Sequence, residues 1–323
     1  MLTAIIQLGI GLGILSFGGH YLVEGAVRIA LMARLSPGVI GLTIVAMGTS
    51  MPELAVSLGA AARGASDVAY GNVTGSNIFN IAFILGLTAL LKPIATSRQT
   101  VRLEYPFMVI AMGMQLLLAR DGVIDRVEGL FFFGSMIAFI WYLVRMSRVT
   151  GDEPQGIETD QAARELARVP PTSKLWAVNI GRVALGIVGL AGGAELMVRG
   201  AITIAEVWGI SERVIGLTII AVGTSLPELA TSIVAARKGE SEIALGNLVG
   251  SNIFNTLAIL GITASLVDVP VHPAAIQVDN WMMLGVCAVL FPIMRTKYRI
   301  GRMEGGLLLV VYGVYVGWLV MTG

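Results

Sequence analysis

The most constraining feature of this sequence is an internal repeat with an offset of 175 residues. Residues 39–88 align with residues 214–263 without a gap, and 32 of these 50 positions are identical. The identities include helix-breaking and polar residues, in GTSMPELA at 48–55 against GTSLPELA at 223–230, and in GNVTGSNIFN at 71–80 against GNLVGSNIFN at 246–255. Chance similarity between apolar helices does not preserve such residues. The chain therefore consists of two related halves.

Both halves are too apolar for a water-soluble protein. Of the 323 residues, 55% are hydrophobic and 13% are charged, against about 25% charged in an ordinary soluble domain. A bilayer core about 30 Å thick takes about 20 helical residues to cross, which leaves room for about ten spans. The first apolar run lacks a basic leading region and a cleavage site, so we expect a span and not a removable signal. We predict an all-α membrane protein with ten transmembrane helices, at 3–32, 39–62, 68–91, 104–119, 128–147, 178–205, 213–236, 243–267, 278–294 and 303–321.

One polar stretch, at 148–176, separates the halves. It predicts a linker between a first repeat at 1–147 and a second repeat at 177–323. Of the 22 Lys and Arg residues, 17 lie nearest to loops on the linker's side of the membrane. Because cytoplasmic loops accumulate basic residues, we expect a cytoplasmic linker and both termini on the opposite face of the cell membrane. Five spans per half is an odd number, so the second repeat is expected to be inverted relative to the first.

Each repeat carries one glutamate, Glu53 or Glu228, near the middle of a predicted span. A charged side chain at that depth costs at least about 2.5 to 3.5 kcal/mol on insertion scales, so something must compensate for it. An ion pair is one explanation, but neither motif helix has a central Lys or Arg. Two carboxylates brought together would instead attract one divalent or two monovalent cations. Inverted repeats with interrupted helices and a site near the midplane are a recurrent plan of secondary transporters.

The first repeated motif also predicts an interrupted helix. Pro52 and Pro227 each follow a Gly-Thr-Ser sequence. Proline lacks an N–H, and its ring clashes with the carbonyl four residues earlier. We therefore expect backbone carbonyls around Ala46 to Thr49 to be free of the helical ladder. Hard cations such as calcium take six to eight oxygen ligands, from carboxylates, amides, hydroxyls and backbone carbonyls.

The second repeated motif adds hydroxyl, amide and glycine positions. Ser76 and Asn80 are four residues apart, as are Ser251 and Asn255, so each pair shares a helix face. For the two asparagines, hydrogen bonding between helices and contact with an ion are equal alternatives. Glycines also four residues apart favour close packing of backbones; they are Gly71, Gly75, Gly246 and Gly250.

Other kinds of site are poorly supported. Cys287 is the single cysteine, and the two histidines, His20 and His272, are unaccompanied, so a transition-metal site is not expected. The linker lacks the pattern of an EF-hand loop, and a net charge of +1 provides no field for nucleic acid. We expect no cofactor. Charge pairs at i,i+4 spacing are predicted to be structural; they are Glu24 with Arg28 and Glu195 with Arg199.

At these motifs the chain resembles the calcium/cation antiporter superfamily, in particular prokaryotic sodium/calcium exchangers. The resemblance covers the whole chain. It implies ten helices, a site between helices 2, 3, 7 and 8, and alternating access in which helices 1 and 6 slide across that core. Well-studied exchangers have an aspartate at the position of Asn255, so this chain keeps two central carboxylates. The implied ion ligands are Ala46, Thr49, Ser50, Glu53, Ser76, Asn80, Ala221, Thr224, Ser225, Glu228, Ser251 and Asn255.

These observations predict a secondary antiporter that exchanges calcium for sodium at a midplane site built on Glu53 and Glu228. Proton/calcium exchange through the same site is the nearest alternative, since buried glutamates can take up protons. A cation channel is less favoured, because inverted repeats with broken helices are typical of carriers. An enzyme is not expected, because the sequence has no Ser/His dyad, no His-rich metal motif and no paired aspartates. The expected partners are calcium and sodium ions, with protons as the alternative coupling ion, and the lipid bilayer.

Overall fold

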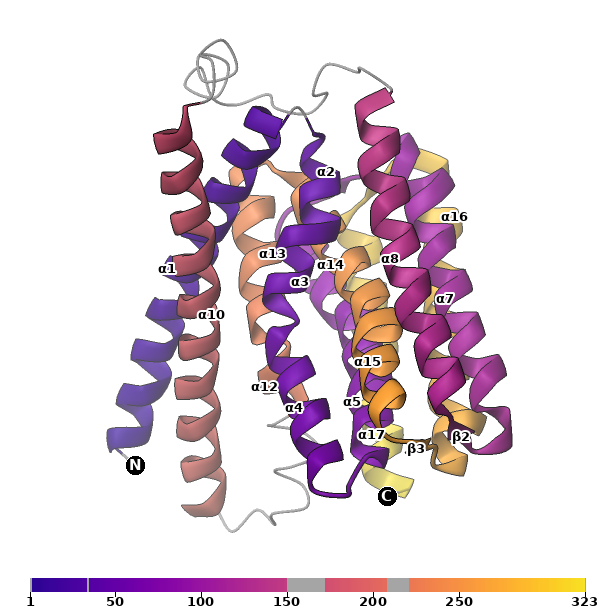
Figure 1. The fold of residues 1–323 in the computed structure, drawn as a ribbon. Coiled ribbons are helices and arrows are strands. Elements are labelled where there is room, and N and C mark those ends of the chain that lie inside the picture. Colours follow the sequence, from indigo (N-terminus) through magenta and orange to yellow (C-terminus); the bar gives the residue numbers. More distant parts are fainter. Residues whose placement is uncertain (1, 34, 150–171, 208–220, 323) are drawn as a thin grey trace.

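The protein is a bundle of helices (Figure 1), and the computed structural model describes residues 2–33, 35–149, 172–207 and 221–322. In the first half the helical segments are α1 (Leu2–Ala33), α2 (Pro37–Ile40), η1 (Gly41–Val45), α3 (Ala46–Thr49), α4 (Met51–Ala62), α5 (Asp67–Ile78), η2 (Phe79–Ile84), α6 (Leu85–Leu91), η3 (Thr100–Glu104), α7 (Tyr105–Leu118), η4 (Ala119–Asp121) and α8 (Arg126–Val149). In the second half they are α10 (Ser173–Val207), α12 (Ala221–Thr224), α13 (Leu226–Lys238), α14 (Ser241–Ile253), η6 (Phe254–Ile259), α15 (Leu260–Leu266), η7 (Ala275–Asp279), α16 (Asn280–Lys297) and α17 (Arg302–Thr322).

Seven helices of the described residues are long and apolar enough to cross a membrane. They are Leu2–Ala33, Asp67–Leu91, Thr100–Asp121, Arg126–Arg145, Ser173–Ile204, Ser241–Leu266 and Ala275–Lys297. An eighth candidate is a broken span, Pro37–Thr49 with Met51–Ala62, bent by 44°. Eight of the ten predicted stretches agree with these bounds to within about five residues. The stretch predicted at 303–321 agrees with α17, which is not among these candidates, and the stretch predicted at 213–236 agrees with the end of α13 and can be compared only from residue 221 onward, not at its start. That start, and the linker at 150–171, lie outside the described residues.

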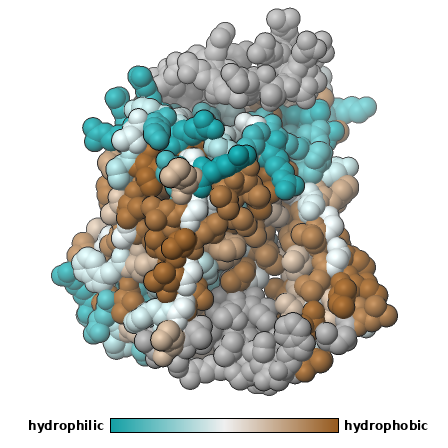
Figure 2. Space-filling view, turned by 180° about the vertical axis from the view of Figure 1, so that it is seen from behind, coloured by the Kyte–Doolittle hydropathy of each residue, from teal (hydrophilic) through white to brown (hydrophobic). Residues whose placement is uncertain are grey.

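Exposed apolar side chains cover the outside of the bundle, and its interior holds polar side chains as well as apolar ones. Ile110, Leu130 and Val188 are 62%, 61% and 68% exposed, as expected for residues that face lipid. Figure 2 shows apolar surface across the middle of one face, with hydrophilic residues gathered above it. Glu53 and Glu228, by contrast, are fully buried. This arrangement is that of a protein solvated by a bilayer.

The boundaries of the helices repeat with the same offset as the sequence. The series α5, η2 and α6 ends at residues 78, 84 and 91, and the series α14, η6 and α15 ends at residues 253, 259 and 266. Short strands join the halves: β1 (Ile94–Ala95) pairs with β4 (Arg299–Ile300), and β2 (Val123–Ile124) pairs with β3 (Val269–Pro270). Each strand of the first half therefore pairs with a strand of the second half.

The long helices α1 and α10 pack against each other in antiparallel fashion through glycines spaced seven residues apart. A Cβ atom added at Gly18 would lie 2.7 Å from the backbone nitrogen of Leu190, and one at Gly186 would lie 2.6 Å from that of Leu22. Only glycine permits this approach of two backbones. The glycines that make such contacts are Gly11, Gly18 and Gly25 on α1, and Gly186, Gly193 and Gly200 on α10.

Helix α14 lies in the centre of the molecule, since its whole membrane-spanning window is buried. Its glycines pack as predicted: a Cβ atom at Gly246 would lie 2.8 Å from the carbonyl of Gly38, and one at Gly250 would lie 2.6 Å from that of Leu42. At Gly71 and Gly75 an added Cβ atom would meet nothing within 4 Å among the described residues, which leave out residues 208–220. Close packing at these two glycines stays a prediction.

Candidate cation site

Two interrupted helices meet at the centre of the bundle. Helix α3 ends at Thr49, Ser50 has non-helical angles (φ −85°, ψ 10°), and α4 begins at Met51. The second half repeats this break at Ser225 (φ −90°, ψ 9°), between α12 and α13. Each proline is then in the first turn of the new helix, where its missing N–H is not needed. The predicted interruption is confirmed, and the break lies two residues before the proline.

The two glutamates occupy equivalent positions at these breaks. Glu53 lies in the first turn of α4 and Glu228 in the first turn of α13. The N-terminus of a helix carries partial positive charge and therefore stabilises a carboxylate. Both side chains are 0% exposed. No ion pair within the described residues neutralises either carboxylate.

Each carboxylate accepts a hydrogen bond from the break of the other half. Ser50 Oγ donates to Glu228 Oε1 at 2.8 Å, and Ser225 Oγ donates to Glu53 Oε1 at 2.9 Å. These two bonds are equivalent under the 175-residue offset. The breaks of the two halves thus face each other, and each half completes the surroundings of the other half's glutamate.

Helices α5 and α14 bring further hydroxyls to the same place. Ser76 Oγ lies 3.3 Å from Ser225 Oγ, and Ser251 Oγ lies 3.5 Å from Glu228 Oε1. Thr49 Oγ1 lies 3.5 Å from Ser251 Oγ. Hydroxyl oxygens from both halves therefore surround the two carboxylates.

The asparagines Asn80 and Asn255 lie one residue into π-helical turns, η2 and η6. Asn80 Nδ2 donates to Asn252 Oδ1 at 3.4 Å, and Asn255 Nδ2 donates to Asn77 Oδ1 at 3.2 Å. Hydrogen bonding between helices, one of the two alternatives predicted for these residues, is therefore present. It uses only the amide nitrogens.

Four buried oxygen atoms at the centre have no hydrogen-bond partner among the described residues. They form two repeat-related pairs: Oε2 of Glu53 and Glu228, and Oδ1 of Asn80 and Asn255. Carboxylate and amide oxygens accept but cannot donate, and leaving such atoms unpaired in a buried place costs about 1 to 3 kcal/mol each, more for charged groups. Oxygens of these kinds are the ligands that sodium and calcium take. The site thus presents an excess of acceptors suited to a cation.

One backbone carbonyl differs from the expectation for Ala46 to Thr49. The Ala46 carbonyl is not free, because it accepts from the Ser50 N–H at 3.0 Å and from Thr49 Oγ1 at 3.2 Å. The reason is that the helix stays regular up to Thr49. In the second half the Ser225 N–H donates to the carbonyl of Val222 at 3.2 Å. Val222 is one residue beyond Ala221, the equivalent of Ala46. Thr224 is buried at the end of α12.

Two asparagines that we did not single out from the sequence fix the glutamate backbones. Asn72 Nδ2 donates to the carbonyl of Glu53 at 3.2 Å, and Asn247 Nδ2 lies 3.5 Å from that of Glu228. Each asparagine also donates to a serine that lies one turn after the glutamate on the glutamate's helix. Asn72 donates to Ser57 at 3.0 Å, and Asn247 donates to Ser232 at 3.1 Å. The sequence does contain a sign of their role, because both asparagines and both serines are identical between the repeats.

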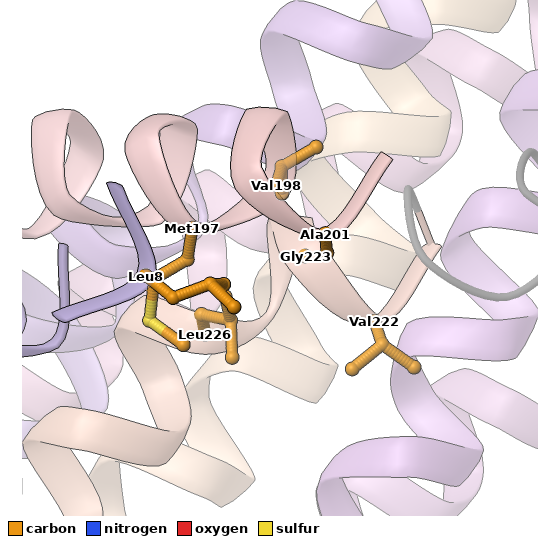
Figure 3. Close-up of a pocket in the computed structure, with 7 residues that line it drawn as sticks. All are labelled: Leu8, Met197, Val198, Ala201, Val222, Gly223 and Leu226. Atoms are coloured by element: carbon orange, nitrogen blue, oxygen red, sulfur yellow. The ribbon is translucent and has the colours of Figure 1, made fainter. Parts of the chain in front are cut away.

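A separate cavity of about 320 Å³ lies between α1, α10 and the break of the second half (Figure 3). The described residues that line it are all apolar. The cavity nevertheless lies beside the break, because Gly223 and Leu226, which line it, are close in sequence to Ser225. The lining residues are Leu8, Met197, Val198, Ala201, Val222, Gly223 and Leu226.

The predicted structural ion pairs are confirmed. Arg28 lies 2.9 Å from Glu24, and Arg199 lies 2.6 Å from Glu195. Arg182 of α10 also approaches Glu24, at 3.7 Å, so this pair links α10 to α1. Among the described residues, no three His, Cys, Asp or Glu side chains form a group that could hold a metal ion.

A membrane-embedded bundle that buries two acidic side chains on broken helices has the architecture of a membrane transport protein. Comparison with known proteins gives the family. Residues 3–145 and 178–321 match the family described as sodium/calcium exchanger protein. The chain belongs to this family.

Several prokaryotic relatives match over nearly their whole length. The chain is 41% identical to the putative antiporter CaxA of Alkalimonas amylolytica, over 97% of each chain. It is 31% identical to the sodium/calcium exchanger MaX1 of Methanosarcina acetivorans, over 95% of each chain. The solved structure of the sodium-calcium exchanger NCX_Mj, soaked without Na⁺ and Ca²⁺, is similar with a TM-score of 0.84 and 28% identity, over 98% of this chain and 99% of that one.

Proposed function

We propose that this protein is a secondary antiporter that exchanges calcium for sodium, with Glu53 and Glu228 as the charged ligands of one central site. The observation that carries the proposal is the set of four buried, unpartnered oxygens of Glu53, Glu228, Asn80 and Asn255. Two carboxylates balance one calcium ion or two sodium ions. Competition of these ions for the same oxygens would couple their movements. The names of relatives such as MaX1 agree with this pair of ions.

The surrounding fold supports alternating access through two inverted repeats of five spans. Repeat-related helices run in opposite directions where they meet: Asn77 contacts Asn255, and Asn80 contacts Asn252. Figure 1 places both chain ends at one end of the bundle, with the ends of α8 and α10 that flank the linker at the other. An inverted repeat offers two equivalent conformations that open the same site to opposite sides. We propose ten spans in total, with residues 1–147 and 177–323 as the repeats.

Transport by the purified protein in lipid vesicles tests this function. Vesicles loaded with sodium should accumulate external calcium, and uptake should stop when the sodium gradient is removed. Uptake driven equally well by a proton gradient without sodium would favour proton/calcium exchange. Calcium flux without any counter-ion on the opposite side would favour a channel. Absence of calcium movement under every gradient would overturn the proposal.

A further inference from the structure

A chain of hydrogen bonds extends from Asn255 into the interior behind the proposed site. Asn255 Nδ2 donates to Asn77 Oδ1 at 3.2 Å, and Asn77 Nδ2 donates to Thr256 Oγ1 at 2.9 Å. Thr256 Oγ1 donates to Gln115 Oε1 at 3.2 Å, and Gln115 Nε2 donates to Thr74 Oγ1 at 2.8 Å. All five side chains are buried. Gln115 on α7 is therefore linked to Asn255 through two intermediates.

This chain of hydrogen bonds determines which way the Asn255 amide faces. Rotating that amide by half a turn would set its Oδ1 against Oδ1 of Asn77, and two acceptors cannot form a hydrogen bond. In the observed direction Asn255 Oδ1 is left without a partner. Gln115 holds the far end of the chain, because its Oε1 and Nε2 both have partners.

The repeat-related asparagine is held differently. Asn80 Nδ2 donates to Asn252 Oδ1 at 3.4 Å, and Asn252 Nδ2 approaches Met108 Sδ at 3.7 Å. A thioether sulfur is a weak acceptor. The hydrogen bonds behind Asn80 therefore continue only to the amide of Asn252, whose own contact with Met108 is weak.

The difference has a simple origin in the sequence. The asparagines themselves are identical between the halves, but three residues that extend the chain are not. At the 175-residue offset, three polar residues have apolar equivalents: Thr74, Gln115 and Thr256 correspond to Val249, Leu290 and Ile81.

We propose that Gln115 is a positioning residue for the cation site, which acts through Thr256 and Asn77 to hold Asn255 Oδ1 in place for the ion. This inference rests on the proposed function. It makes the two repeat-related amides unequal: Asn255 is a fixed ligand, whereas Asn80 is free to adjust. Outer-shell partners that orient metal ligands typically change metal affinity by about 10- to 100-fold when they are mutated.

The first experiment compares Gln115→Met with Leu290→Met, its matched control at the equivalent position of the other half. Methionine keeps the length of glutamine and removes both hydrogen bonds. We expect Gln115→Met to raise the calcium concentration at half-maximal exchange by about tenfold and to leave the maximal rate near the wild-type value. Leu290→Met should match wild type in both quantities. Calcium titration calorimetry in detergent gives the same comparison without transport.

A second set of variants tests the route from Gln115 to Asn255. Thr256→Val cuts the same chain one link nearer the site, so it should shift the half-saturating concentration as Gln115→Met does, and the double variant should shift it no further. It also serves if Gln115→Met fails to fold. Combined with Asn255→Ala, Gln115→Met should have no added effect, whereas with Asn80→Ala its effect should be fully retained.

Wild-type calcium affinity in Gln115→Met and Thr256→Val would overturn the inference. So would equal additivity with Asn255→Ala and Asn80→Ala, because a general loosening of α7 affects both sides alike. The proposed function fails by a different result, namely calcium binding by the Glu53→Gln variant that equals that of wild type.

Discussion

In the proposed function, the two buried glutamates decide whether the central site binds cations. Glu53→Gln and Glu228→Gln each remove one of two negative charges and keep the shape of the side chain. We expect each variant to lose calcium exchange altogether, because half of the negative charge is gone. Each should stay folded, because an unpaired buried charge destabilises the folded state and the variant has one fewer. Calcium uptake into vesicles and thermal unfolding in detergent measure the two effects. Near-normal exchange by either variant would rule out the carboxylate pair as the site.

The serine hydroxyls at the breaks should matter less than the carboxylates. Ser50→Ala and Ser225→Ala remove the donors to Glu228 and Glu53. Water or the ion itself can take over a lost hydroxyl contact, so we expect weaker calcium affinity and measurable exchange. Because the two bonds are equivalent, the two variants should have similar calcium affinities. Complete loss of exchange in one of them alone would show that the halves use these serines differently.

The resemblance drawn from the sequence implies an aspartate at the position where this chain has Asn255. If the number of carboxylates limits how many monovalent ions bind, Asn255→Asp should change the ratio of sodium to calcium, and wild type should be closer to electroneutral exchange. Burial and nearby negative charges favour the protonated form of the new carboxyl group, so its effect should be greatest at alkaline pH. Reversal potentials of wild type and variant, measured over a range of pH, give the ratio. Identical ratios throughout would mean that Asn255 does not set the stoichiometry.

Residues with an unusual character for their surroundings could be found from the sequence. A glutamate in an apolar span and its copy 175 residues later were enough to select Glu53 and Glu228. The hydrogen-bond partners were harder to find, because which serine reaches which carboxylate depends on how the two halves face each other. Asn72 and Asn247 were missed since an asparagine beside a glycine reads equally well as packing. The role of Gln115 could not be read from either motif, because it lies on a different helix.

At the scale of helices, the seven-residue glycine spacing on α1 and α10 sets how closely they approach. Gly18→Ala would place a Cβ atom 2.7 Å from the backbone of Leu190, whereas Gly13→Ala meets nothing within 4 Å among the described residues. We expect Gly18→Ala to lower the stability of the protein by roughly 1 to 3 kcal/mol, as overpacking does, and Gly13→Ala to have little effect. Thermal unfolding of the two variants in detergent makes the comparison. Equal unfolding temperatures would contradict a tight contact at Gly18.

The helices themselves were predictable, because long apolar runs bounded by charges and prolines fix their ends. The irregularities within these helices were harder to predict. The break was expected from Pro52, yet it falls at Ser50, since a proline fits the first turn of the next helix. The π turns that begin at Phe79 and Phe254 leave no pattern in composition. They follow from packing in the crowded centre, where such turns often accompany functional sites.

For the molecule as a whole, the proposed inverted arrangement predicts where each end of the chain lies. A cysteine-reactive label on Asp160→Cys should be reached only from the cytoplasmic side, and labels on cysteines placed at either terminus only from the other side, because the predicted topology puts 17 of 22 basic residues on the linker's side. Replacing the single native cysteine, Cys287, which is buried, leaves one reactive site per variant. Labels at the termini and at residue 160 reached from the same face would exclude two repeats of five spans.

The reciprocal bonds between Ser50 and Glu228 and between Ser225 and Glu53 have the form of a twofold dimer interface, in which residue i meets j and j meets i. The centre of the molecule is therefore a place where two identical subunits could have met, and the covalent connection between them is not what shapes it. The presence of both halves in one chain has another consequence. A pair of identical subunits would carry glutamine at both positions equivalent to Gln115, or leucine at both. A chain that contains both halves can hold glutamine at 115 and leucine at 290, so the two sides of the proposed ion site can differ.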